Sequence, residues 1–190
     1  MTGVHAKYPE AYVAFLVEFH ATRDYFECHE IMEEHWKSHP GDPFTDAWIG
    51  LLQVAVALYH ERRGNVEGAR KLLTAAFGRL RESDLDRLGL DGRDTIERVR
   101  RRLERLEAAK PDEAPAYADL DLPVRDPELK RLCTEKCAAL GLVWGAPSDP
   151  AADALVHKHA RRDRTAVVEA RLAAWRLRQE RRRENGASDG

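Results

Sequence analysis

The residues best suited to chemistry lie between Asp24 and Gly68, where polar side chains interrupt two apolar helical patterns. His29 and Glu33 are four residues apart, so on a helix their side chains can converge on one point. Imidazole and carboxylate together suit a divalent transition metal such as Zn, Mn or Fe. His60, in the second pattern, would complete a two-histidine, one-carboxylate set with open positions for water, as a hydrolytic metal centre needs.

The same residues also fit a hydrogen-bonded network without a metal. A buried Glu33 is tolerable beside a protonated His29 or His60, and Gln53 can donate and accept hydrogen bonds at once. Such a network, to which Asn65 could belong, would fix the register of the two helices. We favour this interpretation; metal binding and metal-free acid/base catalysis stay open as alternatives.

Other residues near this cluster have less specific roles. Glu30 points about 100° away from His29 on a helix and is expected to be a solvated charge or a contact to another helix. Phe26, Trp36 and Trp48 are expected in the core, with the lining of a ligand pocket as the alternative. The motif H-E-x-x-E lacks the second histidine of the zinc-protease motif, so a protease is not predicted.

Apolar spacing, prolines, glycines and the capping residues Asp24, Asn65 and Asp126 predict the helices of the chain. On a helical wheel, the face with His29 and Glu33 also holds Tyr25, Phe26, Met32 and Trp36, and we expect it to be buried. The third helix is apolar almost all round and should be central. Small residues at 68 and 69 should let the fourth helix pack closely on it. The expected ranges are 9–22, 24–38, 44–63, 66–81 and 94–109.

Residues 111–127 contain four prolines and predict a linker or an extended surface segment. Helices are expected from residue 127 and over 151–184. From 157 to 185 there are ten Lys and Arg against four acidic residues, so nucleic-acid binding through this Arg-rich tail is a further, less favoured hypothesis. The predicted division is a bundle over 1–110, a linker over 111–127, and a C-terminal helical extension over 128–190.

The composition fits one well-buried domain with room for an appendage, because the chain has 190 residues, 43% of them hydrophobic and 34% charged. No apolar run is long enough to span a bilayer, and the first residues lack a secretory signal pattern, so a cytoplasmic location and no membrane partner are expected. Three cysteines make a poor disulfide framework. Free thiols are therefore predicted.

The two apolar patterns resemble the DUF309 family of small all-helical bacterial and archaeal proteins. That family's pattern is F-E-x-H-E-x-x-E-x-x-W, then G-L-x-Q-x-A-x-A-x-x-H and G-N-x-x-G-A. The matching residues are Phe26, Glu27, His29, Glu30, Glu33, Trp36, Gly50, Gln53, His60, Gly64, Asn65, Gly68 and Ala69. The resemblance covers residues 10 to 80. It implies a helical fold and the location of a site, but no reaction.

The sequence therefore predicts an all-α fold with a bundle of about five helices and two more at the C-terminal end. We expect a non-catalytic binding or interaction module, whose partner is a small molecule, a protein or a second copy of the chain. The alternative is a metal-dependent, hydrolase-like enzyme with His29, Glu33 and His60 as ligands and Glu30 or Gln53 assisting proton transfer. Whether the chain is an enzyme stays open, and no cofactor other than a divalent metal is indicated.

Overall fold

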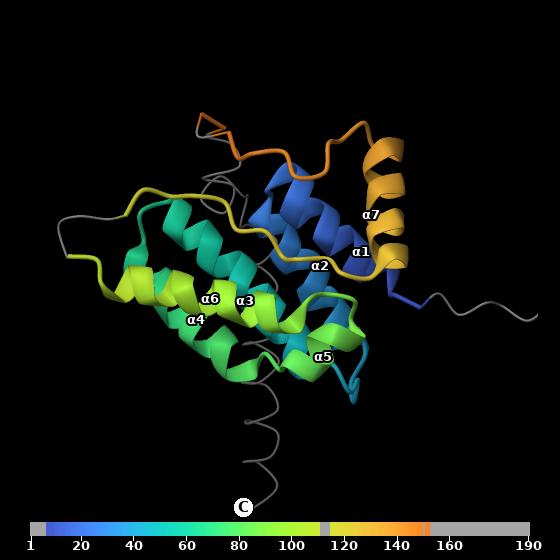
Figure 1. The fold of residues 1–190 in the computed structure, drawn as a ribbon, viewed down its shortest axis with the longest axis horizontal. Coiled ribbons are helices and arrows are strands. Elements are labelled where there is room, and N and C mark those ends of the chain that lie inside the picture. The colour runs from blue at the N-terminus through green and yellow to red at the C-terminus, as the bar shows by residue number, and fades with distance from the viewer. Residues whose placement is uncertain (1–6, 111–114, 150, 153–190) are drawn as a thin grey trace, which may run out of the picture. The chain divides into compact units, whose positions relative to one another are not determined.

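The computed structural model describes residues 7–110, 115–149 and 151–152 (Figure 1). This part of the chain contains seven α-helices, one π-helical turn and no strand, which confirms the predicted all-α fold. Helices α1, α2, α3, α4 and α6 are the five predicted helices, while the short α5 lies where a polar linker was expected. The elements are α1 (Glu10–Val17), η1 (Glu18–Thr22), α2 (Tyr25–Ser38), α3 (Thr45–Arg62), α4 (Val66–Arg79), α5 (Glu82–Arg87), α6 (Gly92–Glu107) and α7 (Pro127–Ala139).

Three helices begin at the side-chain caps that the sequence indicates. The carboxylate of Asp24 accepts a hydrogen bond from the backbone N–H of Glu27 at 3.0 Å and so caps α2. Asn65 caps α4 in the same way, directly after Gly64, whose φ of +77° ends α3 in the left-handed conformation. Asp126 caps α7 ahead of Pro127. Each cap satisfies backbone donors that a helix start leaves without an intrahelical partner.

Helix α3 is the central helix, as predicted. It packs against α2 on one side and α4 on the other, and Trp48, Leu51 and Leu58 are among its fully buried side chains. The close approach of α3 and α4 depends on Gly50, because a Cβ there would lie 2.7 Å from Leu80 Cδ2. Gly68, to which we assigned this role, instead leaves room for the side chain of the capping residue Asn65.

The end of the first helix departs from a regular α-helix. The predicted helix over 9–22 becomes α1 followed by the π-helical turn η1, and Arg23 then adopts a left-handed backbone with φ of 56°. A left-handed conformation is uncommon for a residue with a side chain and has to be held by its surroundings. The side chains of His20 and Arg23, both buried, provide that hold through contacts described below.

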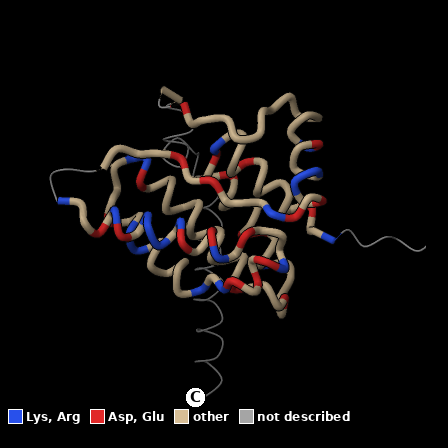
Figure 2. Tube along the Cα trace, viewed as in Figure 1, with Lys and Arg blue, Asp and Glu red and all other residues tan. Residues whose placement is uncertain are grey.

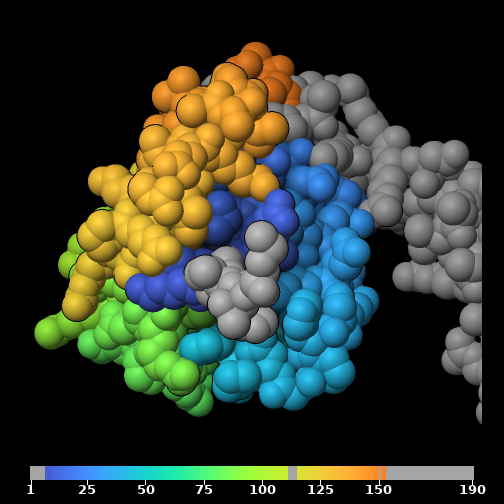
Figure 3. Space-filling model, turned by 90° about the vertical axis from the view of Figure 1, so that its right-hand side faces the viewer, coloured from blue at the N-terminus to red at the C-terminus, as the bar shows by residue number. Residues whose placement is uncertain are grey.

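Residues 115–126, hereafter the strap, run across the bundle as an extended segment and lead into α7 (Figure 1, yellow). Leu120 and Leu122 are buried in the core, and Leu90 and Val124 form an isolated antiparallel bridge. Helix α7 then packs on α1 (Figure 3). The strap was predicted as a linker or an extended surface segment; it is extended, and its buried leucines tie it to the core. The described part of the predicted extension therefore packs on the bundle.

Charged residues of both signs follow one another along α6 (Figure 2), and its arginines pair with glutamates one turn away. Among the described residues, no helix combines the length and the apolar character needed to cross a membrane. The predicted helix over 151–184 and its Arg-rich tail lie outside the described residues, apart from residues 151 and 152.

Candidate functional site

Helix α2 buries only part of the face that the helical wheel predicted. Its buried side chains are Tyr25, Cys28, Met32 and His35. Tyr25 and Met32 belong to the predicted face, whereas its other members, Phe26, His29, Glu33 and Trp36, are only half-buried. The predicted arc is broad, and the core covers the edge of it that holds Tyr25 and Met32. The polar residues of α2 are consequently within reach of solvent.

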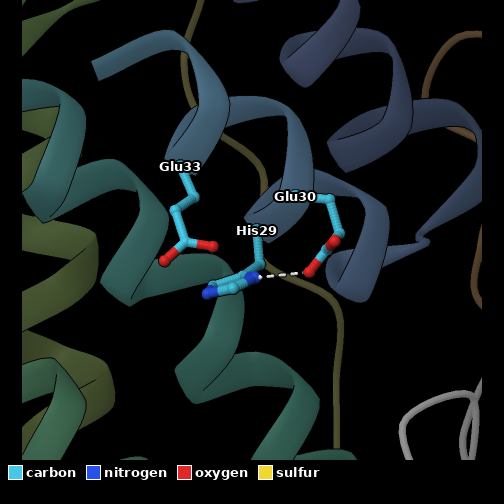
Figure 4. A group of neighbouring side chains, drawn as sticks. All are labelled: His29, Glu30 and Glu33. Carbon is cyan, nitrogen blue, oxygen red and sulfur yellow. Dashed lines mark hydrogen bonds and ion pairs between the residues drawn. The ribbon is translucent and has the colours of Figure 1, made fainter. Parts of the chain in front are cut away.

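Three ligand-type side chains meet on this half-buried face. His29, Glu30 and Glu33 each offer one atom such that all three atoms lie within 4.8 Å of one another (Figure 4). Their side chains are 32%, 33% and 37% exposed. Exposure of this size leaves room for water or an added ligand. The group therefore has the residue types, spacing and access that a divalent cation requires.

Glu30 belongs to this group, contrary to the expectation that it points away from His29. Its Oε1 lies 3.1 Å from His29 Nδ1 and accepts a hydrogen bond from that nitrogen. A neutral His29 that donates from Nδ1 carries its free lone pair on Nε2. Figure 4 shows this second ring nitrogen on the side of Glu33. A carboxylate on the far nitrogen is the usual way to orient a metal-binding histidine.

Glu33 is ionised and already close to a cation. Lys37 Nζ lies 2.7 Å from Glu33 Oε1, one helical turn along α2. This hydrogen bond from Lys37, together with the smaller effect of His29, holds the pKa of Glu33 below its usual value. The carboxylate therefore needs no deprotonation to bind a cation, but a bound cation has to compete with Lys37.

The predicted metal set of His29, Glu33 and His60 differs from the observed group in one member. His60 Nδ1 lies 2.9 Å from Asn65 Nδ2 and accepts a hydrogen bond from that amide, while Asn65 Oδ1 caps α4. Among the described residues, the group within 4.8 Å contains Glu30 and lacks His60. His60 and Asn65 thus form a separate polar pair at the turn between α3 and α4.

The remaining residues of the predicted cluster are spread along α3 and the core. Trp48 is 1% exposed and packs edge-on against His35, so it is a core residue. Phe26 and Trp36 are partly buried and pack against the core from α2. Gln53 is half-buried, and its Oε1 is fully buried without a hydrogen-bond partner among the described residues. A buried acceptor in that state is unfavourable unless a donor or cation reaches it.

A buried polar network beneath the strap involves residues that the sequence did not single out. His20 Nδ1 donates to Leu16 O at 2.8 Å, and its Nε2 accepts from the N–H of Leu122 at 3.0 Å. The ring also stacks on Trp144, with centroids 4.3 Å apart. Burial lowers the pKa of His20 to about 4. His20 is therefore a neutral anchor for the strap and for the loop after α7.

Arg23 is the second anchor of the strap. Its guanidinium donates to the carbonyls of Leu120 at 3.3 Å and Ala146 at 2.9 Å, and it pairs with Asp121 at 2.8 Å.

Glu61 on α3 forms a second buried ion-pair group. Its side chain is 1% exposed and pairs with Arg102 at 2.8 Å and Arg105 at 2.6 Å. Both partners come from α6, far along the chain. No local pattern in the sequence could reveal these contacts.

Comparisons with known proteins place the chain in a family. The model of the family "Domain of unknown function (DUF309)" matches residues 12–72. "Uncharacterized protein YpuF" from Bacillus subtilis (strain 168) is 42% identical over 166 residues, which cover 86% of this chain and 92% of that protein. No solved structure matches the chain with significance. The family match contains the group on α2 and all of α3 and ends within α4.

Proposed function

Because the chain belongs to the DUF309 family and carries a compact histidine–glutamate group within the family match, we propose that it is a helical binding module for a divalent transition-metal ion. The observation that supports this is the convergence of His29, Glu30 and Glu33 within 4.8 Å on one accessible face of α2. Buried structural networks do not need such access. The half-exposed setting favours a ligand site over a purely structural network.

Each residue of the group has a distinct part in the proposed site. His29 Nε2 and the Glu33 carboxylate are the ligands, because the hydrogen bond to Glu30 occupies His29 Nδ1. Glu30 orients the imidazole and raises its basicity. The positive ion would replace Lys37 as the counter-charge of Glu33. An imidazole with a carboxylate and water is a donor set for Zn, Mn or Fe in their divalent states.

Metal titration of the full chain after removal of endogenous ions tests the proposal. We expect one equivalent of Zn²⁺ or Mn²⁺ to bind in isothermal titration calorimetry. His29→Ala and Glu33→Ala should weaken binding by at least about tenfold, since each removes a ligand. Glu34→Ala is the matched control, because Glu34 is an exposed acid on the same helix outside the group. Equal affinity in all four proteins, or no binding by the wild type, would refute the proposal.

A second candidate is a metal-dependent hydrolase at the same residues. It is favoured by the roughly one-third exposure of His29, Glu30 and Glu33, which leaves coordination positions for a water nucleophile. The metal-loaded protein would then hydrolyse p-nitrophenyl esters or phosphates faster than His29→Ala. Equal rates for the two proteins would exclude this candidate and leave metal binding standing.

A further inference from the structure

Gln53 on α3 has a property that the proposed site explains. Its Oε1 is buried and has no hydrogen-bond partner within the described part of the chain, although the side chain as a whole is only half-buried. An amide oxygen has two lone pairs and binds cations such as Mn²⁺ as well as hydrogen-bond donors. A buried oxygen that has no hydrogen-bond donor, at the edge of the core, can therefore bind an added donor or cation.

The pairing of α2 with α3 places Gln53 at the level of the metal group. The rings of Phe26 and Tyr59 are 6.3 Å apart, and those of His35 and Trp48 are 5.3 Å apart, so the two helices run antiparallel. Gln53 follows Trp48 by five residues and precedes Tyr59 by six. On α2, five residues before His35 is position 30, and six residues after Phe26 is position 32. That level is midway between His29 and Glu33.

Gln53 also lies on the same side of the helix pair as the group on α2. The α3 side chains that face α2 include Trp48 and Tyr59, and the neighbouring stripe on the solvent side is half-buried. This stripe contains Ile49, Leu52, Gln53, Val56 and His60. On α2 the half-buried stripe is the one with His29 and Glu33, and Figure 4 shows both side chains extending toward α3.

We propose that Gln53 Oε1 is the ligand that α3 contributes to the metal site, beside His29 Nε2 and Glu33. This inference rests on the proposed function. It makes the donor set one imidazole nitrogen and two protein oxygens, completed by water. Such a set suits Mn²⁺, Fe²⁺ or Zn²⁺ and disfavours soft Cu⁺, which prefers sulfur. The ion would join two helices, so metal binding stabilises their pairing as well as filling a site.

Two substitutions at Gln53 test this role in the full chain, with MnCl2 and ZnCl2 as probes in calorimetry and thermal unfolding. Gln53→Leu keeps a similar volume but removes the oxygen. We expect the metal-free variant to unfold at the same or a higher temperature, because the unmet acceptor is gone. Its metal affinity should fall by at least about tenfold, which a merely structural glutamine would not cause.

Gln53→Glu supplies a stronger, charged ligand at the same point. It should bind Mn²⁺ more tightly than the wild type, and its metal-free form should be less stable. Ile49→Leu, one turn away on the same stripe, is the control and should leave affinity unchanged. If affinity is unchanged in either Gln53 variant while His29→Ala abolishes binding, the role of Gln53 is overturned and the proposed function stands. If the wild type binds neither ion, both are overturned.

Discussion

Acidification should release the strap by protonating His20. In the neutral ring, Nδ1–H donates to Leu16 O at 2.8 Å and Nε2 accepts from the N–H of Leu122 at 3.0 Å. A proton on Nε2 would face that N–H and remove the acceptor. The ring is also enclosed by Trp144, so water cannot take over the contact. These features explain why burial lowers the pKa of His20 to about 4.

The size of the effect follows from the pKa difference between the folded and unfolded chains. The folded pKa, about 4, lies below the ordinary value of 6.5, so the unfolded chain binds the proton first as pH falls. Stability contributed by neutral His20 is therefore complete above pH 6.5 and is lost as pH falls toward 4. Between pH 7 and pH 5 the loss in free energy of unfolding from this residue is about 2 kcal/mol.

Urea unfolding at several pH values from 7 to 4.5 measures this loss. Other groups in the chain also titrate in this pH range, so the useful quantity is the difference between wild type and His20→Gln. His20→Gln should be less stable than the wild type at pH 7. Between pH 7 and pH 5, however, its free energy of unfolding should fall by about 2 kcal/mol less than that of the wild type. His39→Gln removes an exposed histidine and should keep the full decline. Parallel pH profiles for wild type and His20→Gln would refute the reasoning.

Three further predictions concern helix packing, the proposed site and the buried ion pairs. Gly50→Ala should destabilise the chain by about 1–3 kcal/mol in urea unfolding through overpacking, whereas Gly78→Ala, where a Cβ meets nothing within 4 Å, should not destabilise it. Lys37→Ala should tighten metal binding severalfold in calorimetry by freeing Glu33, and unchanged affinity would show that no competition exists. Glu61→Gln should cost about 3–5 kcal/mol by leaving two arginines without their carboxylate, and a wild-type urea midpoint would contradict this.

Features set by neighbouring residues could be predicted from the sequence. Asp24, Asn65 and Asp126 cap their helices as expected, because a cap and the backbone donor it satisfies lie within three residues. The centrality of α3 also follows from its own apolar surface. The burial of Cys133 and Cys137 agrees with their position on the apolar stripe of α7.

Features that depend on distant partners could not be predicted in the same way. The wheel of α2 predicts a broad face, and which edge of that face is buried depends on how Tyr25 and Met32 fit the rest of the core. The direction of Glu30 depends on its side-chain conformation, which a Cα-based wheel omits. The burial of His20 depends on Leu122, which lies 102 residues later. One local signal was overlooked, namely the alternation of apolar residues in the strap, which the surrounding prolines and acids obscured.

The anchoring of the strap also fixes an order of events during synthesis. Helices α1 to α6 leave the ribosome before the chain that satisfies Arg23, because its partners Leu120 and Ala146 are made much later. At translation rates of roughly 5–20 residues per second, the interval from Glu107 to Ala146 lasts about 2–8 s. Before the strap is made, Arg23 can reach only earlier partners, such as the carbonyl of Phe19 and the guanidinium of Arg62. The contacts that the strap and the loop after α7 make with His20 and Arg23 are therefore among the last that the described fold can complete.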